Sequence, residues 1–166
     1  GKKVTVMGMG RSGLGAVKLL LAEGAEPFVT DSKDDGELTE YCKELDALDV
    51  PYETGGHSGQ AFADANLIVI SPGVPAALPP LQAAREQGVP VLGELELASR
   101  FCRSKILAVT GTNGKTTTTE LLRAMIDHCG HTVALAGNND MPLSLAVRQP
   151  NAPEYIVVEV SSYQLE

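Results

Sequence analysis

Short apolar runs recur along the chain and alternate with amphipathic stretches of helical length. In the first half, the runs typical of buried strands are residues 3–9, 27–30, 67–70 and 89–92. The stretches between and after them have helical spacing of apolar residues, and they are residues 12–23, 37–48, 80–87 and 94–101. This alternation predicts an α/β protein with a parallel, doubly wound sheet.

The same pattern restarts after residue 104. Apolar runs at residues 105–109, 133–136 and 155–160 predict three strands, and a helix is predicted at 116–129 between the first two. We therefore expect a Rossmann-like domain at residues 1–93, followed by the start of a P-loop NTPase-type α/β domain at 94–166. Because three strands make a poorly covered parallel sheet, we expect the chain to be a piece of a longer protein.

Composition and charge narrow the possible partners. The 166 residues are 43% hydrophobic, which is enough for a core, and the formal net charge is −8. An acidic balance argues against a nucleic-acid or anionic-membrane surface, so neither partner is expected. Three scattered cysteines without a C-x-x-C pair, and no apolar run or signal segment typical of export, predict a cytoplasmic protein with reduced thiols.

The strongest chemical motif lies between the predicted strand at 105–109 and the helix that follows. It reads Gly111-Thr112-Asn113-Gly114-Lys115-Thr116-Thr117. Glycines let backbone amides approach a phosphate, Lys115 can reach the β- and γ-phosphates, and the Thr116 hydroxyl can ligate Mg²⁺. The motif predicts a site for ATP. The usual early glycine is replaced by Val109, so the loop is a shortened variant; the alternative is an ordinary strand-to-helix turn.

Two later features of the second half are also candidates. Glu159 interrupts an apolar strand, and Mg²⁺ beside Thr116 would compensate the cost of burying its carboxylate. The alternative is an edge strand whose Glu159 faces water. Gly137-Asn138 follows the strand at 133–136, where Asn138 can offer an amide to a ligand or simply form a polar turn.

The first domain carries a dinucleotide-type fingerprint. The segment Gly8-Met9-Gly10-Arg11-Ser12-Gly13 follows the first predicted strand, and Asp31 ends the second. Ser71-Pro72-Gly73 follows the strand at 67–70 and belongs to the same sheet edge. The alternatives are tight packing for the glycines, a turn role for Asp31, and a rigid turn at residues 71–75. Gly55-Gly56-His57-Ser58 is expected to be a flexible loop, only weakly indicated as lying near a ligand.

Taken together, these motifs resemble those of the Mur ligases of bacterial cell-wall synthesis, over essentially the whole chain. The resemblance rests on residues 8–13, 71–75, 111–117 and 137–138, and on the segment Glu159-Val160-Ser161-Ser162-Tyr163-Gln164-Leu165-Glu166. The chain departs from the family pattern at Asn139-Asp140, where a small apolar residue and glycine are usual.

The resemblance implies a role for each motif. The first domain would hold the UDP part of a substrate, with the residues Gly10, Arg11, Ser12, Gly13, Asp31, Ser32, Ser71, Pro72 and Gly73; among these, Asp31 and Ser32 would meet the uracil end. Residues 111–117 would bind ATP, and Thr116 and Glu159 would ligate Mg²⁺. Asn138, Ser161 and Gln164 would orient the muramoyl-alanine arm. Lys115, Asn138 and Glu159 would be the catalytic residues.

The implied reaction adds D-glutamate to UDP-N-acetylmuramoyl-L-alanine through an acyl phosphate, at the expense of ATP. The D-glutamate pocket would lie outside this chain, so the 166 residues alone are expected to be inactive, and a monomer is expected. Two other classes remain open: a nicotinamide-dependent oxidoreductase using Gly8, Gly10, Gly13 and Asp31, and a non-catalytic nucleotide-binding module. A folate polyglutamylating ligase would share residues 111–117 but lack the first domain.

Overall fold

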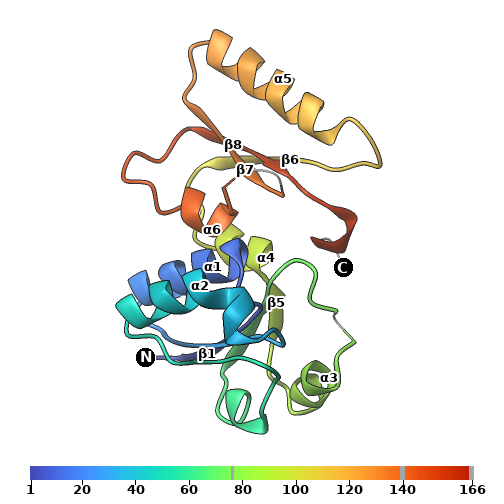
Figure 1. Cartoon of the computed structure of the whole chain (residues 1–166). Coiled ribbons are helices and arrows are strands. Elements are labelled where there is room, and N and C mark those ends of the chain that lie inside the picture. The colour runs from blue at the N-terminus through green and yellow to red at the C-terminus, as the bar shows by residue number, and fades with distance from the viewer. Residues whose placement is uncertain (76, 139–140, 165–166) are drawn as a thin grey trace. The chain divides into compact units, whose positions relative to one another are not determined.

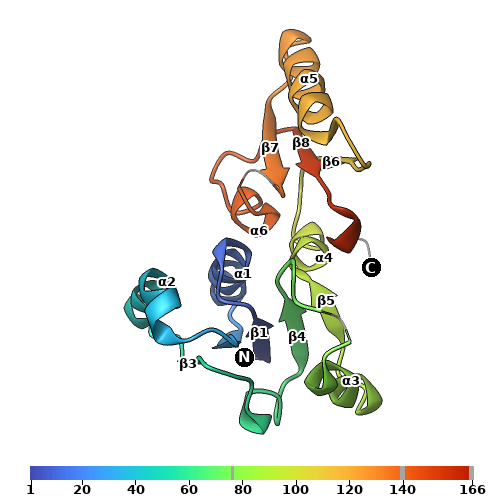
Figure 2. The same cartoon turned by 45° about the vertical axis from the view of Figure 1, so that its right-hand side comes forward.

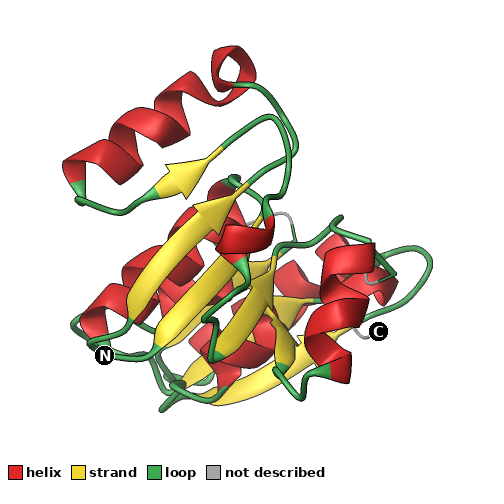
Figure 3. Ribbon diagram, turned by 90° about the horizontal axis from the view of Figure 1, so that it is seen from below, coloured by secondary structure: helices red, strands yellow, loops and turns green. Residues whose placement is uncertain are grey.

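The computed structural model describes residues 1–75, 77–138 and 141–164. The chain divides into two compact units, Gly1–Glu94 and Leu95–Glu166. Each unit is an α/β structure built on its own parallel sheet (Figure 3).

Unit 1 contains five parallel strands in the order β3-β2-β1-β4-β5. Along the chain its elements are β1 (Lys3–Met7), α1 (Arg11–Ala22), β2 (Glu26–Thr30), α2 (Asp35–Ala47), β3 (Tyr52–Glu53), η1 (Gly59–Ala61), β4 (Leu67–Ile70), α3 (Pro79–Glu86) and β5 (Val91–Gly93). The helices α1 and α2 lie on one side of the sheet and α3 lies on the other (Figure 2). Because the strand order reverses beside β1, the loops after β1 and β4 flank a topological switch point, where α/β sheets bind ligands.

The core of unit 1 has two layers, one on each face of the sheet. Met7 and Ile68 are fully buried beneath Leu81 of α3. On the opposite face, Val17 of α1, Val29 of β2 and Leu45 of α2 are buried near one another. Burial on both faces explains why β4, with the sequence Leu-Ile-Val-Ile, is continuously apolar rather than alternating.

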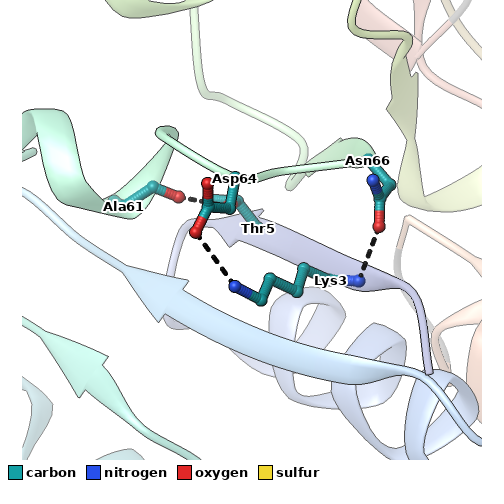
Figure 4. A network of polar contacts seen from close by, with 5 residues as sticks. All are labelled: Lys3, Thr5, Ala61, Asp64 and Asn66. Atoms are coloured by element: carbon teal, nitrogen blue, oxygen red, sulfur yellow. Dashed lines mark hydrogen bonds and ion pairs between the residues drawn. The ribbon is translucent and has the colours of Figure 1, made fainter.

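The connection from β3 to β4 has no α-helix and is fastened to β1 instead (Figure 4). The Lys3 backbone N–H donates to Asn66 Oδ1 at 3.0 Å, and Lys3 Nζ pairs with Asp64 at 2.9 Å. The Thr5 hydroxyl donates to the carbonyl of Ala61. A hollow of about 510 Å³ lies beside this segment and the amino-terminal ends of β1 and β2. It is therefore at the opposite edge of the sheet from the carboxyl ends of the strands, where α/β sheets generally bind ligands.

Unit 2 has three parallel strands in the order β6-β8-β7. After α4 (Glu94–Ser99), which begins at the last residue of unit 1, the elements are β6 (Lys105–Val109), α5 (Lys115–His128), β7 (Val133–Gly137), α6 (Leu143–Ala146), β8 (Tyr155–Glu159) and η2 (Ser162–Gln164). The long helix α5 covers one face of the sheet (Figure 1). The central strand β8 is buried from Ile156 onward, whereas Leu121 and Met125 of α5 remain 60% and 56% exposed.

The predicted strands and helices are present, with ends shifted by one or two residues. The first strand ends at Met7 rather than at residue 9, because Gly8 adopts φ +98° and leaves the extended conformation. Besides the 3₁₀ turns η1 and η2, two short elements, β3 and α6, were not predicted. Neither is long enough to show a periodic pattern of apolar residues. The strand β3 is defined by the pairing of Tyr52 with Val29 of β2.

Cys42, Cys102 and Cys129 are all free thiols, and Cys42 is buried. Among the described residues, the helices are too short or too polar to span a bilayer.

Candidate functional site

The loop after β1 contains three glycines, Gly8, Gly10 and Gly13, and the structure requires glycine at only some of these positions. A Cβ atom at Gly13 would lie 1.9 Å from the carbonyl oxygen of Gly8, and one at Gly8 would lie 2.8 Å from Ser71 Cβ. A Cβ at Gly10 would meet nothing within 4 Å. Gly8 and Gly13 are therefore required for packing, whereas Gly10, the residue that caps α1, leaves open space at a helix N-terminus.

Ser71 holds the same loop from the neighbouring strand. Its hydroxyl donates to the Gly8 carbonyl at 3.1 Å, and its N–H donates to the Met7 carbonyl at 2.9 Å. The residue is only 9% exposed, while Pro72 and Gly73 beside it are exposed. The contact observed for Ser71 is therefore with the protein itself, and its contact with a ligand stays a prediction.

Asp31 connects the end of β2 to the loop after β1. One carboxylate oxygen accepts the Met9 N–H at 2.6 Å, and the other accepts the Lys33 N–H at 2.9 Å. Ser32 is exposed next to it, and Arg11 and Ser12 open α1, where backbone N–H groups lack partners within the helix. The predicted residues of unit 1 thus gather at the carboxyl edge of β1, β2 and β4.

The loop at residues 54–58 is more firmly held than expected. The Gly55 N–H donates to the Lys33 carbonyl at 2.8 Å, and the Gly56 N–H donates to the Asp31 carbonyl at 3.1 Å. The Ser58 N–H donates to the Glu53 carboxylate at 2.8 Å. The loop therefore adjoins the Asp31 turn. In the sequence, this loop is marked only by the pair Gly55-Gly56 before His57, and that pattern by itself specifies no contact.

These contacts also change the acidity of Glu53. Partial burial disfavours the charged carboxylate, but hydrogen bonds from Ser58 and Thr30 outweigh it, so the pKa of Glu53 is lowered below its usual value. Since the folded state favours the ionised form, Glu53 contributes stability above the unfolded-state pKa, and this contribution is lost as the pH falls through the folded-state value.

We expect Glu53→Gln to flatten the acid side of the stability profile. Urea denaturation between pH 6 and about pH 3 should show wild-type stability falling more steeply than that of the variant, because Gln has no charge to lose. Glu23→Gln, at the exposed end of α1, is the control for loss of one carboxylate. Equal slopes for wild type and Glu53→Gln would contradict the assignment.

The loop of unit 2 has the backbone of an anion cradle. Gly111 has φ +152° and Gly114 has φ +77°, conformations that side chains rarely allow. Gly114 caps α5, and Lys115 is the first residue of that helix. Lys115 Nζ donates to the Gly111 carbonyl at 2.9 Å, so the ammonium group lies on its own loop. Thr112, Asn113 and Thr117 are exposed around it.

Glu159 and Thr116 meet at the end of the central strand. Glu159 pairs in register with Val109 on one side and Gly137 on the other, and it is 4% exposed. The Thr116 hydroxyl donates to its carboxylate at 2.8 Å. The alternative of a water-facing Glu159 on an edge strand is therefore wrong, because β8 lies between two neighbours.

These oxygens suit a hard divalent cation. The described residues contain no group of three or more His, Cys, Asp or Glu placed to hold a metal ion. A site with one carboxylate and one hydroxyl fits Mg²⁺, which usually keeps several waters and takes phosphate oxygens as further ligands. It does not fit a cation whose ligands must all come from the protein.

The third loop of unit 2 is packed against the same strand end. The Asn138 N–H donates to the Glu159 carbonyl at 3.0 Å, and a Cβ at Gly137 would lie 2.2 Å from that carbonyl oxygen. Ser161 donates to Gln164 Oε1 through its N–H and its hydroxyl, at 2.9 and 3.0 Å. Asn138 is exposed, and the departure at residues 139–140 lies outside the described residues.

Fold and loops together define an α/β protein in which each unit has a glycine-containing turn leading from its first strand into a helix. The sequence profile described as "Mur ligase MurD-like, N-terminal domain" matches residues 2–93, and that of the "Mur ligase middle domain" matches residues 109–166. The chain belongs to the Mur ligase family.

Curated relatives agree with the profiles. The UDP-N-acetylmuramoylalanine–D-glutamate ligase of Geotalea uraniireducens is 43% identical over 165 residues, covering 99% of this chain and 36% of the relative. The protein of the same name from Desulfosudis oleivorans is 45% identical over 166 residues, covering 99% and 36%. The chain thus spans about a third of the length of the curated relatives it matches. Such names give no support to an oxidoreductase or a non-catalytic module.

Solved structures share the fold. The UDP-N-acetylmuramate-alanine ligase MurC from Thermotoga maritima aligns with a TM-score of 0.55 at 22% identity, covering 97% of this chain and 37% of that one. A UDP-N-acetylmuramate:L-alanyl-gamma-D-glutamyl-meso-diaminopimelate ligase from Neisseria meningitides aligns with a TM-score of 0.59 at 22% identity, covering 95% and 52%. At this identity the likeness bears on the fold alone.

Proposed function

We propose that this chain is the amino-terminal part of an ATP-dependent ligase that adds D-glutamate to UDP-N-acetylmuramoyl-L-alanine in peptidoglycan precursor synthesis. The observation that carries the proposal is the pairing of Thr116 with the buried Glu159 at the mouth of the Gly111–Thr117 loop. The names of the curated relatives support the choice of amino acid and of acceptor.

The chemistry requires activation of a carboxylate. A free carboxylate is a poor electrophile, so an oxygen of the alanyl carboxylate first takes the γ-phosphoryl group of ATP, which gives an acyl phosphate and releases ADP. The amine of D-glutamate then attacks the carbonyl carbon, and phosphate leaves as the amide forms. Such phosphoryl transfer depends mainly on positioning and on stabilising negative charge.

The proposal assigns ATP binding to unit 2 and UDP binding to unit 1. In unit 2, residues 111–117 hold the triphosphate, and Lys115 stabilises the transferring charge. Thr116 and Glu159 would hold Mg²⁺, which when bound offsets phosphate charge. Asn138, Ser161 and Gln164 orient the muramoyl-alanine arm. In unit 1, residues 10–13 bind the diphosphate. The rest of the UDP lies against Asp31, Ser32 and residues 71–73.

The setting follows from the reaction. Because the reaction consumes ATP and a UDP-linked precursor, we place the protein in the cytoplasm. We also propose a monomer without nucleic-acid or membrane partners. The 166-residue chain carries no D-glutamate pocket in this proposal and is inactive by itself.

The proposal is tested with the complete protein that contains this chain. We expect phosphate release from ATP to require both UDP-N-acetylmuramoyl-L-alanine and D-glutamate, with L-glutamate as the stereochemical control. Release that is independent of D-glutamate would contradict it.

A binding experiment tests the two-site assignment. By calorimetry, Asp31→Ala should weaken UDP binding and leave Mg-ATP binding unchanged, whereas Lys115→Ala should do the reverse. Loss of the same ligand in both variants would contradict separate sites.

A further inference from the structure

The loop at residues 54–58 makes contacts that none of the assigned roles uses. Gly55 and Gly56 have φ +71° and +151°, so the tight path of the loop depends on glycine. Their N–H groups donate to the carbonyls of Lys33 and Asp31, which lie on either side of Ser32. The loop therefore holds the turn at residues 31–33 through its backbone, in addition to the contact between the Met9 N–H and the Asp31 carboxylate.

A buried hydroxyl anchors this loop to β2. Thr30 is fully buried, and its Oγ1 lies 2.7 Å from His57 Nδ1, 2.8 Å from Glu53 Oε1 and 3.2 Å from the Gly56 carbonyl oxygen. Glu53 Oε1 also accepts the Ser58 N–H. Glu53 of β3 and two residues of the loop, Gly56 and His57, thus converge on one side chain at the end of β2.

The direction of these hydrogen bonds follows from proton counting. The Thr30 hydroxyl has one hydrogen, and both the Gly56 carbonyl and an ionised Glu53 carboxylate can only accept. The lowered pKa of Glu53 keeps it ionised at neutral pH. If Thr30 donates its hydrogen to one of these oxygens, the short contact with His57 is a hydrogen bond only when Nδ1–H donates to Thr30 Oγ1. The network therefore favours the Nδ1-protonated form of His57.

The position of the turn gives this network a functional meaning. A nucleotide whose phosphates lie at the N-terminus of α1 extends its nucleoside over the end of the neighbouring strand β2, where Asp31 and Ser32 stand. We propose that residues 54–58 form the nucleoside-side wall of the ligand site in unit 1, with His57 as the positioning residue that fixes the Asp31–Lys33 turn. This inference rests on the proposed assignment of unit 1 to a uridine diphosphate.

The test compares four variants of the 166-residue chain by calorimetric titration with UDP. His57→Ala and His57→Phe remove the donor, and UDP affinity should fall about fivefold to tenfold, the effect of one net hydrogen bond. His57→Asn places an amide N–H near the position of Nδ1 and should restore most of the affinity. His128→Ala, in α5 of unit 2, is the matched control and should bind UDP as wild type does.

Two measurements without ligand separate positioning from general destabilisation. In His57→Ala, the amides of Gly55 and Gly56 should exchange hydrogen faster, while that of Val6 in the centre of β1 should not change. In the wild type at about pH 8, where imidazole is ordinarily neutral, ¹⁵N spectra should show the Nδ1-protonated tautomer.

Each result is decisive. Wild-type affinity in His57→Ala, equal losses in His57→Ala and His57→Asn, or an Nε2-protonated tautomer would overturn the inference while leaving the proposed function in place. Failure of the wild type to bind UDP would overturn the assignment of unit 1 itself, and the inference with it.

Discussion

Gly13→Ala is expected to unfold unit 1. The new Cβ would lie 1.9 Å from the Gly8 carbonyl oxygen, a backbone atom that cannot rotate away, and 3.1 Å from Ser71 Oγ. Relief requires α1 to separate from the loop after β1, which would disrupt burial of Val17 and Leu20. We expect a loss of about 4 kcal/mol or more in the free energy of unfolding, a large part of the stability of a typical domain.

Thermal and urea denaturation monitored by circular dichroism would measure this loss. Gly10→Ala is the matched control, since it makes the same chemical change three residues earlier with nothing within 4 Å of the new Cβ. Gly10→Ala should stay folded, and any effect should fall on UDP affinity. A Gly13→Ala protein as stable as Gly10→Ala would show that the loop is not packed as described.

Lys115→Ala in the complete protein is expected to lower kcat/KM for ATP by about 10²- to 10³-fold, the usual effect of removing one preorganised group that stabilises transition-state charge. The loss should appear in D-glutamate-dependent phosphate release. Stability should change little, because the observed partner of Nζ is a single carbonyl of its own partly exposed loop.

Lys105→Ala is the control for the Lys115 prediction. Lys105 is an exposed lysine at the amino-terminal end of β6, where its ammonium lies 5.3 Å from the Tyr155 ring centroid, at the other end of the strand from the loop. Its loss should leave kcat/KM for ATP near the wild-type value. If the two variants lost activity equally, net charge rather than the position of Lys115 would be responsible.

The fold was largely predictable because its long elements have strong patterns. The central strand β8 shows this best, since its apolar, β-branched run Ile156-Val157-Val158 is identified as a strand without tertiary information, and four of its five residues are buried. The strand β3 shows the limit. It is two residues long, and only pairing with β2 makes it a strand.

The sequence indicated candidate site residues, but it did not indicate their contacts. Thr116 and Glu159 were proposed as partners from their chemistry, and the structure places their oxygens 2.8 Å apart. Asp31 was expected to face a ligand, whereas both of its oxygens accept backbone N–H groups. Its role toward a ligand remains a prediction. The network around Thr30 was not foreseen, because it joins residues 23 to 27 positions apart.

The amino-acid sequence by itself determined the succession of strands and helices, the glycines at the strand ends, and the family. These depend on local periodicity and on short motifs, which neighbouring residues specify. Only the tertiary structure decided which of those glycines has no room for a side chain, and how the Asp31 and His57 loops are fastened together. Such contacts join separate strand ends, and strand order and register bring those ends together in space.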